Sequence, residues 1–195
     1  MLNVLYEPFP DSVRADGRTY PVQTDFRVWL RLSDQLADRN LSPEQTAAAL
    51  LRVFRSPVRQ FPESLLDAVF AFLGAEDLYY HDDEDPENPE ELPEKIPLGG
   101  PPLFDWKFDS RFILGDFLRF YQLDLLTVDF LHWFAFRALF DALPEDSLCM
   151  KRIAWRSADL SQIRNHDEKR RILKLKRAVA IPFTLSDEEI GAAFF

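Results

Sequence analysis

Residues 104–140 read FDWKFDSRFILGDFLRFYQLDLLTVDFLHWFAFRALF and decide the fold, because they hold twelve aromatic residues. Apolar positions recur at helical spacing over residues 112–121 and again over residues 127–139. The short segment at residues 123–126 separates these runs, so we predict two helices packed antiparallel. We expect Trp133 to lie in the core that the two helices form. The neighbours expected around it are Phe112, Phe120 and Phe130.

The residues before this stretch predict a hairpin followed by three helices. Two short extended runs flank an Asp-Gly dipeptide at residues 16–17, which tolerates the positive φ values of a tight β-hairpin. A first helix is expected over residues 24–40, and Ser42-Pro43-Glu44-Gln45 is typical of the start of a second. A third is expected over residues 62–74, with Gly74 in the left-handed conformation that ends many helices.

The negative charge of the chain is concentrated in one segment. The formal net charge is −10, and between residues 76 and 94 there are ten acidic residues and no basic one. Outside this segment the acidic and basic residues balance, so the rest of the chain need not repel an anionic partner. Residues 76–102 are also rich in proline, which opposes helix formation. We therefore predict a mobile acidic linker there.

Shorter helices are predicted after the aromatic stretch, at residues 145–156 and 159–164, followed by a basic helix at residues 167–180. The predicted fold class is mainly α, a helical bundle with a small N-terminal β-hairpin and a long acidic proline-rich loop. The domains expected are residues 1–75 with the hairpin and three helices, the linker at 76–102, and an aromatic-rich helical part at 103–195. Whether the first and last of these share one core stays open.

The composition indicates a soluble protein. A single cysteine, Cys149, excludes an intramolecular disulfide and favours a reducing compartment. Residues 1–10 lack the basic flank and apolar run of a signal peptide. No stretch approaches the roughly 20 apolar residues of a membrane span. We therefore expect a cytoplasmic location and no membrane partner.

No residue pattern predicts catalysis, a metal ion or a cofactor. The glycine motifs that bind phosphate or position a nucleophile are absent, and the three histidines and Cys149 lack the spacing of a zinc site. His132 is interpreted as a core or boundary residue that donates one hydrogen bond. Asp105 and Asp109, four residues apart, could form a paired-carboxylate site, but we expect them to cap the start of a helix.

The order of several short motifs carries a family resemblance. The early motif is Tyr20-Pro21 followed by Thr24-Asp25-Phe26-Arg27-Val28-Trp29. The later motifs are Phe104-Asp105-Trp106-Lys107-Phe108-Asp109, Tyr121-Gln122-Leu123-Asp124-Leu125, and Leu131-His132-Trp133-Phe134-Ala135-Phe136-Arg137-Ala138-Leu139-Phe140 with Leu143-Pro144. Together they cover most of the chain to about residue 181. In this order they resemble the bacteriophage gene-product-fifteen family of siphovirus tail-module proteins.

This resemblance implies a function in phage tail assembly. Such proteins resemble the products encoded between the major tail protein and the tape-measure protein in phage genomes. It implies a non-catalytic tail assembly chaperone or adaptor that binds the tape-measure protein or other tail proteins in the cytoplasm of the bacterial host. The gene can belong to a phage or a prophage. A structural subunit of the virion and self-association stay open.

Two segments are predicted to bind the partner. Residues 167–180 form a basic amphipathic helix, and residues 186–195 form a last short helix with an apolar end. The predicted partner-binding residues are Ile172, Leu175 and Val179 in the first segment and Ile190, Phe194 and Phe195 in the second. A position of Phe194 and Phe195 in the core is an equal alternative.

The same basic helix supports a second hypothesis, a nucleic-acid-binding accessory protein. The residues that could contact phosphate groups or an acidic partner are Lys169, Arg170, Arg171, Lys174 and Arg177. No recognised nucleic-acid-binding motif precedes this helix, and the acidic linker could neutralise it. Nucleic acid is therefore the less favoured partner, and a contact between the linker and the basic helix is a third hypothesis.

Overall fold

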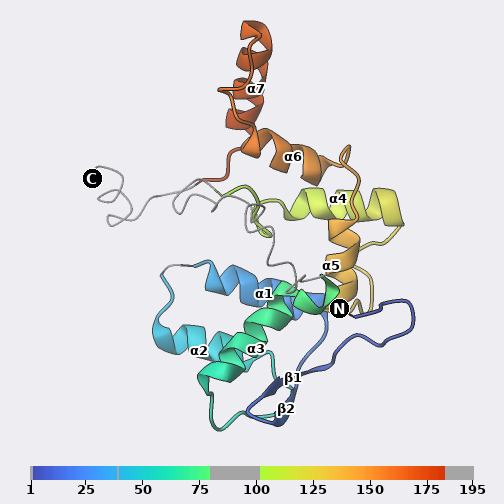
Figure 1. Ribbon diagram of the computed structural model, residues 1–195, viewed down its shortest axis with the longest axis vertical. Coiled ribbons are helices and arrows are strands. Elements are labelled where there is room, and N and C mark those ends of the chain that lie inside the picture. The colour runs from blue at the N-terminus through green and yellow to red at the C-terminus, as the bar shows by residue number, and fades with distance from the viewer. Residues whose placement is uncertain (1, 39, 80–101, 183–195) are drawn as a thin grey trace, which may run out of the picture. The chain divides into compact units, whose positions relative to one another are not determined.

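The computed structural model describes residues 2–38, 40–79 and 102–182, and Figure 1 shows them as helices joined by loops, with one small hairpin. The prediction of a mainly α fold with an N-terminal hairpin is confirmed. Residues 80–101 of the predicted acidic loop, and all residues after 182, lie outside the described residues.

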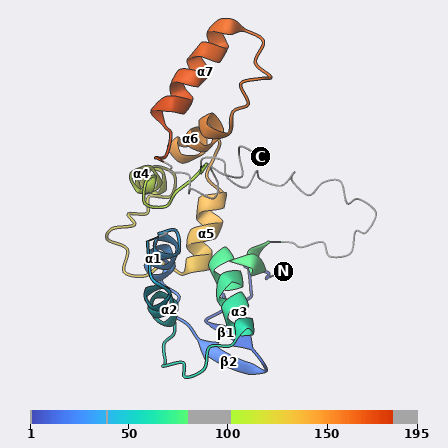
Figure 2. The same ribbon diagram turned by 90° about the vertical axis from the view of Figure 1, so that its left-hand side faces the viewer.

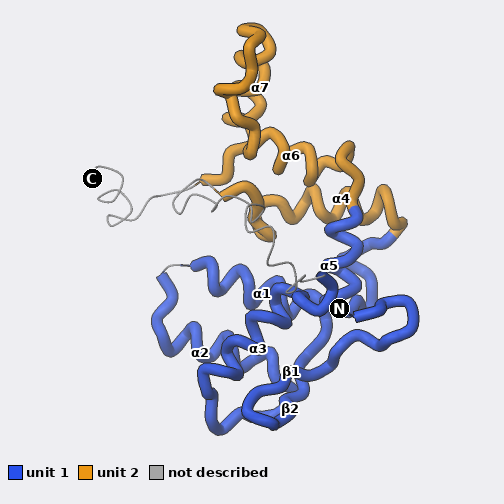
Figure 3. Tube along the Cα trace, viewed as in Figure 1, with its two compact units in different colours: residues 1–82, 123–142 blue, residues 83–122, 143–195 orange. Residues whose placement is uncertain are grey.

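The chain divides into two compact units, which Figure 3 colours separately. Unit 1 contains residues 1–82 and 123–142, and unit 2 contains residues 83–122 and 143–195. The two aromatic helices that were expected to pack as one antiparallel pair fall in different units. The predicted antiparallel pair is therefore not found within either compact unit.

Unit 1 begins with the hairpin. Strand β1 (Ser12–Ala15) pairs antiparallel with strand β2 (Arg18–Pro21). The turn residues Asp16 and Gly17 have φ values of 48° and 71°. Positive φ at both positions is the type I′ geometry, whose twist matches that of the strands, and it is the geometry that the Asp-Gly dipeptide predicted.

Helices α1 (Phe26–Leu36) and α2 (Pro43–Leu51) follow, and α2 begins directly after Ser42, in the motif predicted to start it. The Asp25 side chain accepts a hydrogen bond at 2.9 Å from a backbone nitrogen in the first turn of α1. Ser42 and Gln45 form a reciprocal capping box, in which each side chain accepts a hydrogen bond from the other residue's backbone nitrogen. Local sequence therefore decides where these helices start.

Helix α3 (Glu63–Gly74) leads directly into a short 3-10 helix, η1 (Glu76–Leu78). The residue in the left-handed conformation is Ala75, with φ of 55°, rather than the predicted Gly74. Gly74 is the last helical residue, and the Ala75 side chain is completely buried where the chain turns. Burial of this methyl group helps to offset the cost of the left-handed conformation.

Helix α5 (Trp133–Asp141) begins at Trp133 rather than near residue 127. The segment before it is held in a loop against the start of α1 by two backbone hydrogen bonds. The nitrogen of Phe26 donates to the carbonyl of Leu131 at 3.0 Å, and that of Trp133 donates to the carbonyl of Thr24 at 2.7 Å. These long-range bonds compete with hydrogen bonds within a helix, so α5 begins only at Trp133.

The predicted core position of Trp133 is confirmed, since its side chain is only 1% exposed. Its indole nitrogen donates to the carbonyl oxygens of Phe72 at 3.0 Å and Leu73 at 3.1 Å, at the end of α3. The predicted core position of Phe130 is wrong, because its side chain is 56% exposed, whereas Phe112 and Phe120 belong to unit 2. Trp133 instead joins α5 to α3.

Unit 2 contains helices α4 (Ser110–Tyr121), α6 (Leu148–Ser157) and α7 (His166–Ala178). Helix α6 packs against both α4 and α7. Figures 1 and 2 show α7 standing out from the other two helices of this unit.

Residues 159–164, predicted as a short helix, instead form a turn between α6 and α7. The Asp159 carboxylate accepts hydrogen bonds from the backbone nitrogen and the hydroxyl of Ser161, at 2.8 and 2.7 Å. A short polar side chain that bonds to the backbone two residues later favours a turn over a helix. The prediction of a helix there is therefore wrong.

Candidate partner-binding surfaces

Unit 2 contains a buried ion-pair cluster, formed by Asp109 with Arg152 and Arg156. The side chains of Asp109 and Arg156 are 1% and 4% exposed. The guanidinium group donates to the carboxylate from Nη1 to Oδ2 at 2.6 Å and from Nη2 to Oδ1 at 2.7 Å. Arg152 adds a third donor through Nε at 3.1 Å. Because a buried charge is costly unless it is paired and hydrogen-bonded, this geometry satisfies the carboxylate.

Asp109 was predicted to cap a helix, and this prediction is wrong. It stands at the N-cap position of α4, but its side chain makes no capping hydrogen bond. Burial by itself raises the pKa of Asp109, but the hydrogen bonds from Arg156 and Arg152 outweigh burial and hold the pKa below its ordinary value. The carboxylate is an anchor for two arginines. Asp105 does cap a turn, since its carboxylate accepts a hydrogen bond from the backbone nitrogen of Phe108 at 2.5 Å.

Arg156 also connects separate segments of unit 2. Its Nε donates to the carbonyl oxygen of Val179 at 2.7 Å, and its Nη1 donates to that of Leu103 at 2.9 Å. These bonds join α6 to the end of α7 and to the segment before α4. The Val179 side chain is itself buried, so this predicted partner-binding residue lies inside unit 2, at the base of α7.

A second buried carboxylate, Asp116, orients α6. It accepts hydrogen bonds from the backbone nitrogens of Leu148 at 3.0 Å and Cys149 at 2.8 Å. These amides lack partners within the helix, and the helix dipole favours a negative charge beside them. Burial raises the pKa of the Cys149 thiol to about 12, so the group is a protonated thiol at neutral pH. Among the described residues, no group of three or more His, Cys, Asp or Glu side chains is arranged to hold a metal ion.

His132 occupies the N-cap position of α5 in unit 1. Its Nδ1 accepts a hydrogen bond from the backbone nitrogen of Phe134, and its Nε2 lies 3.1 Å from the carbonyl oxygen of Pro10. The neutral tautomer with a proton on Nε2 satisfies both contacts. Burial lowers the pKa of His132, which favours this neutral form. The prediction of a boundary residue that donates one hydrogen bond is confirmed.

Helix α7 brings the predicted cations together on its surface. The side chain of Asn165 caps the helix by accepting hydrogen bonds from the backbone nitrogens of Asp167 and Glu168. Lys174 and Arg177 follow Arg170 by four and seven positions and therefore share its face. The five cations are exposed, and no ion pair to another described residue involves them: Lys169, Arg170, Arg171, Lys174 and Arg177.

The opposite face of α7 is apolar. Ile172 and Leu175 are half-buried, and no residue within the helical span is fully buried. The Lys176 side chain donates to the carbonyl oxygen of Ala158 at 2.9 Å, which fastens α7 to the segment after α6. The other predicted anchors, Ile190, Phe194 and Phe195, lie outside the described residues.

Unit 1 carries an apolar surface that the sequence analysis did not predict. Val4, Leu5 and Tyr6 are 48%, 89% and 78% exposed. They lie on a turn that Asn3 holds, because its carbonyl oxygen accepts hydrogen bonds from the backbone nitrogens of Tyr6 and Glu7 at 3.2 and 2.8 Å. Three consecutive large apolar side chains before a pair of prolines were visible in the sequence and could have marked this turn.

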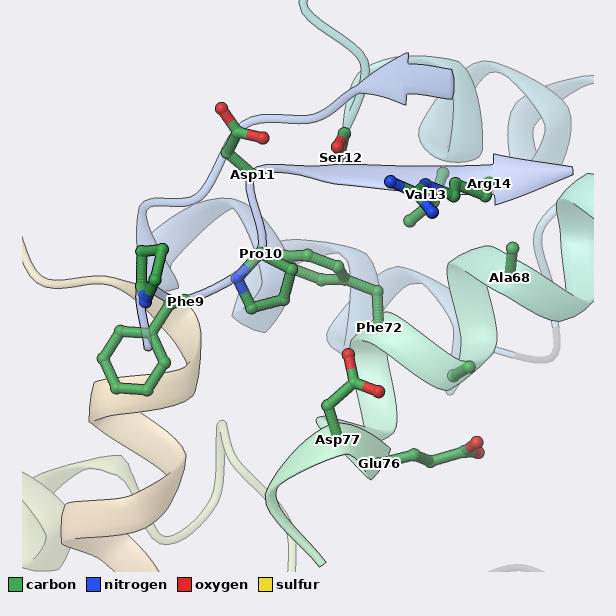
Figure 4. Close-up of a pocket in the computed structure, with 12 residues that line it drawn as sticks. Phe9, Pro10, Asp11, Ser12, Val13, Arg14, Ala68, Phe72, Glu76 and Asp77 are labelled. Carbon is green, nitrogen blue, oxygen red and sulfur yellow. The ribbon is translucent and has the colours of Figure 1, made fainter. Parts of the chain in front are cut away.

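A groove of about 780 Å³ lies near this turn, between β1 and α3. Figure 4 shows the strand and the helix facing each other across it, with Glu76 and Asp77 at its lower end. Phe9, Pro10 and Ala71 contribute apolar surface. No local sequence signal marks this groove, because residues 8–14 and 68–77 become neighbours only through tertiary packing.

Comparisons with known proteins identify the family. No curated protein and no solved structure matches the chain. No helix among the described residues is long and apolar enough to cross a membrane. The family described as Bacteriophage Gp15 protein matches residues 5–181, which include most of both compact units and all of helix α7. We conclude that the chain belongs to the Bacteriophage Gp15 protein family, and that it is a phage structural or morphogenesis protein.

Proposed function

We propose that the protein is a non-catalytic tail assembly chaperone or adaptor that binds the tape-measure protein. Family membership supports a role in phage morphogenesis, and the resemblance of its motifs to siphovirus tail-module proteins supports the finer assignment. The observation that carries the proposal is α7, a helix with opposite cationic and apolar faces that packs chiefly against α6.

The apolar face of α7 suits a reversible contact with a helical partner. Amphipathic helices bind through apolar anchors spaced three, four or seven positions apart, and Ile172 and Leu175 have such spacing. Both are half-buried already, so burying the remainder would contribute about 1 kcal/mol each, roughly half the value for a full side chain. This gain is modest against the cost of association. The contact can therefore be released when tail-tube subunits assemble around the tape measure.

The cationic face adds specificity more than strength. Exposed charges at the rim of an interface steer association and select partners, and salt screens them. Lys169, Arg170 and Arg171 lie at the start of the amphipathic segment, where they can contact acidic side chains of the partner. The proposal therefore predicts a binding reaction whose salt sensitivity comes from these three residues.

Co-expression with the tape-measure protein, followed by affinity pull-down, tests the apolar face. The variant Ile172→Ser with Leu175→Ser should lower retention several-fold, because both anchors are lost. Leu118→Ser is the matched control, since Leu118 is an exposed leucine on α4 of the same unit. Circular dichroism shows whether each variant is folded. Full retention by the folded double variant would exclude this face as the binding site.

Two further variants separate the other predicted contacts. Truncation after Pro182 should leave a folded protein with weaker retention, and failure to fold would instead assign Phe194 and Phe195 to the core. Reversing the charges of Lys169, Arg170 and Arg171 should mainly change the salt dependence of retention. Unchanged salt dependence would show that these three cations do not contribute to the interface.

A nucleic-acid-binding accessory protein is the second candidate function. The observation that favours it is the set of exposed α7 cations, which form no ion pair with described residues. Each phosphate contact releases counterions, so the logarithm of the affinity should fall linearly with the logarithm of the salt concentration. Retention on immobilised DNA with this dependence, lost on charge reversal at Arg170, Lys174 and Arg177, would favour this function over the first.

A further inference from the structure

The two outer edges of the hairpin in unit 1 differ. The outer edge of β2 has a backbone partner at its last residue, because the nitrogen of Arg55 donates to the carbonyl of Pro21 at 3.0 Å, and a bridge joins Val22 to Phe54 just beyond the strand. The outer edge of β1 has no such partner among the described residues. Open strand edges are normally protected, because they can pair with another extended chain.

The backbone groups on the open edge can be named from the pairing pattern. The nitrogen of Val22 donates to the carbonyl of Asp11 at 2.9 Å, so these two residues form a hydrogen-bonded pair. Bonded and non-bonded pairs alternate along an antiparallel ladder, and the pairing register places Ser12 and Arg14 in non-bonded pairs. Their backbone N–H and C=O groups therefore point away from β2. None of these groups has a hydrogen-bond partner among the described residues.

The groove of about 780 Å³ borders this open edge. Its other wall is α3, where the small side chains of Ala68 and Ala71 line the space beside Phe72. A strand that pairs with β1 would run roughly 4.8 Å from it, and four residues would extend about 13 Å. Figure 4 shows β1 and α3 on opposite sides of the space that such a strand would enter.

The charges of the groove select the occupant. Glu76 and Asp77 of η1 lie across from β1, and Arg14 is the only cation among the residues that line the groove in the described part of the chain. The position of η1 is fixed, because Tyr79 donates a hydrogen bond to Asp141 and accepts one from Arg137 at 3.0 Å. Two carboxylates at a fixed place favour a lysine or arginine on the incoming chain.

We propose that the β1–α3 groove binds an extended segment of a partner polypeptide, which adds as a strand to β1 and places a basic side chain against Glu76 and Asp77. Backbone hydrogen bonds to Ser12 and Arg14 supply the register, and the half-buried surfaces of Phe9, Pro10 and Ala71 receive alternate side chains. This interface lies in unit 1 and does not involve α7, so it goes beyond the proposed function and can fail independently of it.

A fluorescein-labelled hexapeptide of alternating valine and lysine is the probe for the full chain. Fluorescence anisotropy should show saturable binding, and NMR hydrogen exchange should show at least tenfold slower exchange of the Ser12 and Arg14 amides when the peptide is bound. A peptide of alternating valine and glutamate, and a valine-lysine peptide with N-methyl groups along one edge, should each bind at least tenfold more weakly. Equal binding of the N-methylated peptide, or no change at the two amides, would overturn strand addition.

Variants of the groove locate the binding site. Ala71→Phe should fill the groove, and Glu76→Lys should repel the lysines, so each should weaken peptide binding at least tenfold. Glu63→Lys is the matched control for charge reversal, because Glu63 is exposed in the first turn of the same helix and does not line the groove. Thermal unfolding checks the fold of each variant. If Ala71→Phe does not fold, the Glu76→Lys variant and the N-methylated peptide still test the proposal. Full binding by a folded Glu76→Lys variant would overturn the proposal, as would sedimentation showing that β1 already pairs with a second copy of the chain.

Discussion

Replacing Asp109 by alanine should destabilise unit 2 by about 3–5 kcal/mol, because it leaves the buried guanidinium group of Arg156 without its counterion. Three hydrogen bonds of 2.6 to 3.1 Å from Arg156 and Arg152 are lost together. The Asp109 and Arg156 side chains are 1% and 4% exposed, so water cannot readily replace the lost acceptor. The penalty is the cost of an unpaired buried charge rather than the net value of the ion pair.

Urea and thermal unfolding followed by circular dichroism measure this effect. A loss of about 3–5 kcal/mol corresponds to a fall of roughly 6–20 °C in Tm for a chain of this size. Hydrogen exchange should show faster opening of α6 and of the backbone near Val179, with no change in α1 of unit 1. Glu145→Ala is the matched control, since this carboxylate is exposed in the same unit and should change stability by less than about 0.5 kcal/mol.

The double variant Asp109→Leu with Arg156→Met separates an unpaired charge from lost packing. Removing both charges should cost far less than removing Asp109 alone. Because the pKa of Asp109 is held below its ordinary value in the folded protein, its stabilisation is complete above the unfolded pKa of about 3.9 and declines as the pH falls through the folded pKa. A single Asp109→Ala variant within about 1 kcal/mol of the parent chain would refute the argument that this pair anchors unit 2.

Three further predictions concern single residues. Trp133→Ala should cost about 3–5 kcal/mol in urea unfolding, because the ring is buried and its nitrogen makes two hydrogen bonds; a stable variant that loses only partner binding would contradict this. Because burial lowers the pKa of His132 below 6.5, the unfolded chain binds the proton more readily, and the unfolding free energy should fall as the pH drops below about 6.5. His132→Asn should flatten that slope, and an unchanged slope would assign it to another group. Cys149 should resist a thiol-reactive dye at pH 8 until the protein unfolds, and rapid labelling of the folded chain would contradict its burial.

Elements with a local chemical signal were predictable from the sequence. The Asp-Gly turn at residues 16–17 needs only two positive φ values, and the Ser42 capping box needs only residues within one helical turn. The spacing of apolar residues likewise located α1 and α7. The family resemblance rested on short motifs in a fixed order, and it is confirmed by the match over residues 5–181.

Features that depend on distant residues were not predictable in this way. Asp109 has the local sequence of a helix cap, but Arg152 and Arg156, more than forty positions away, offer stronger charge-assisted hydrogen bonds, and the carboxylate pairs with them. Helix α5 starts only at Trp133 because Thr24 and Phe26 form backbone hydrogen bonds with Trp133 and Leu131.

The sequence by itself therefore determined the helical class, the hairpin, the capping box that starts α2 and the amphipathic pattern of α7, because each depends on dihedral preferences and periodicity within a few residues. Tertiary structure alone decided that residues 123–142 pack with the N-terminal part, that Phe130 is exposed, and that β1 borders a groove. Burial and long-range hydrogen bonds favour these arrangements through contacts between residues far apart in the chain, and the free energy of such contacts leaves no periodic trace in the sequence.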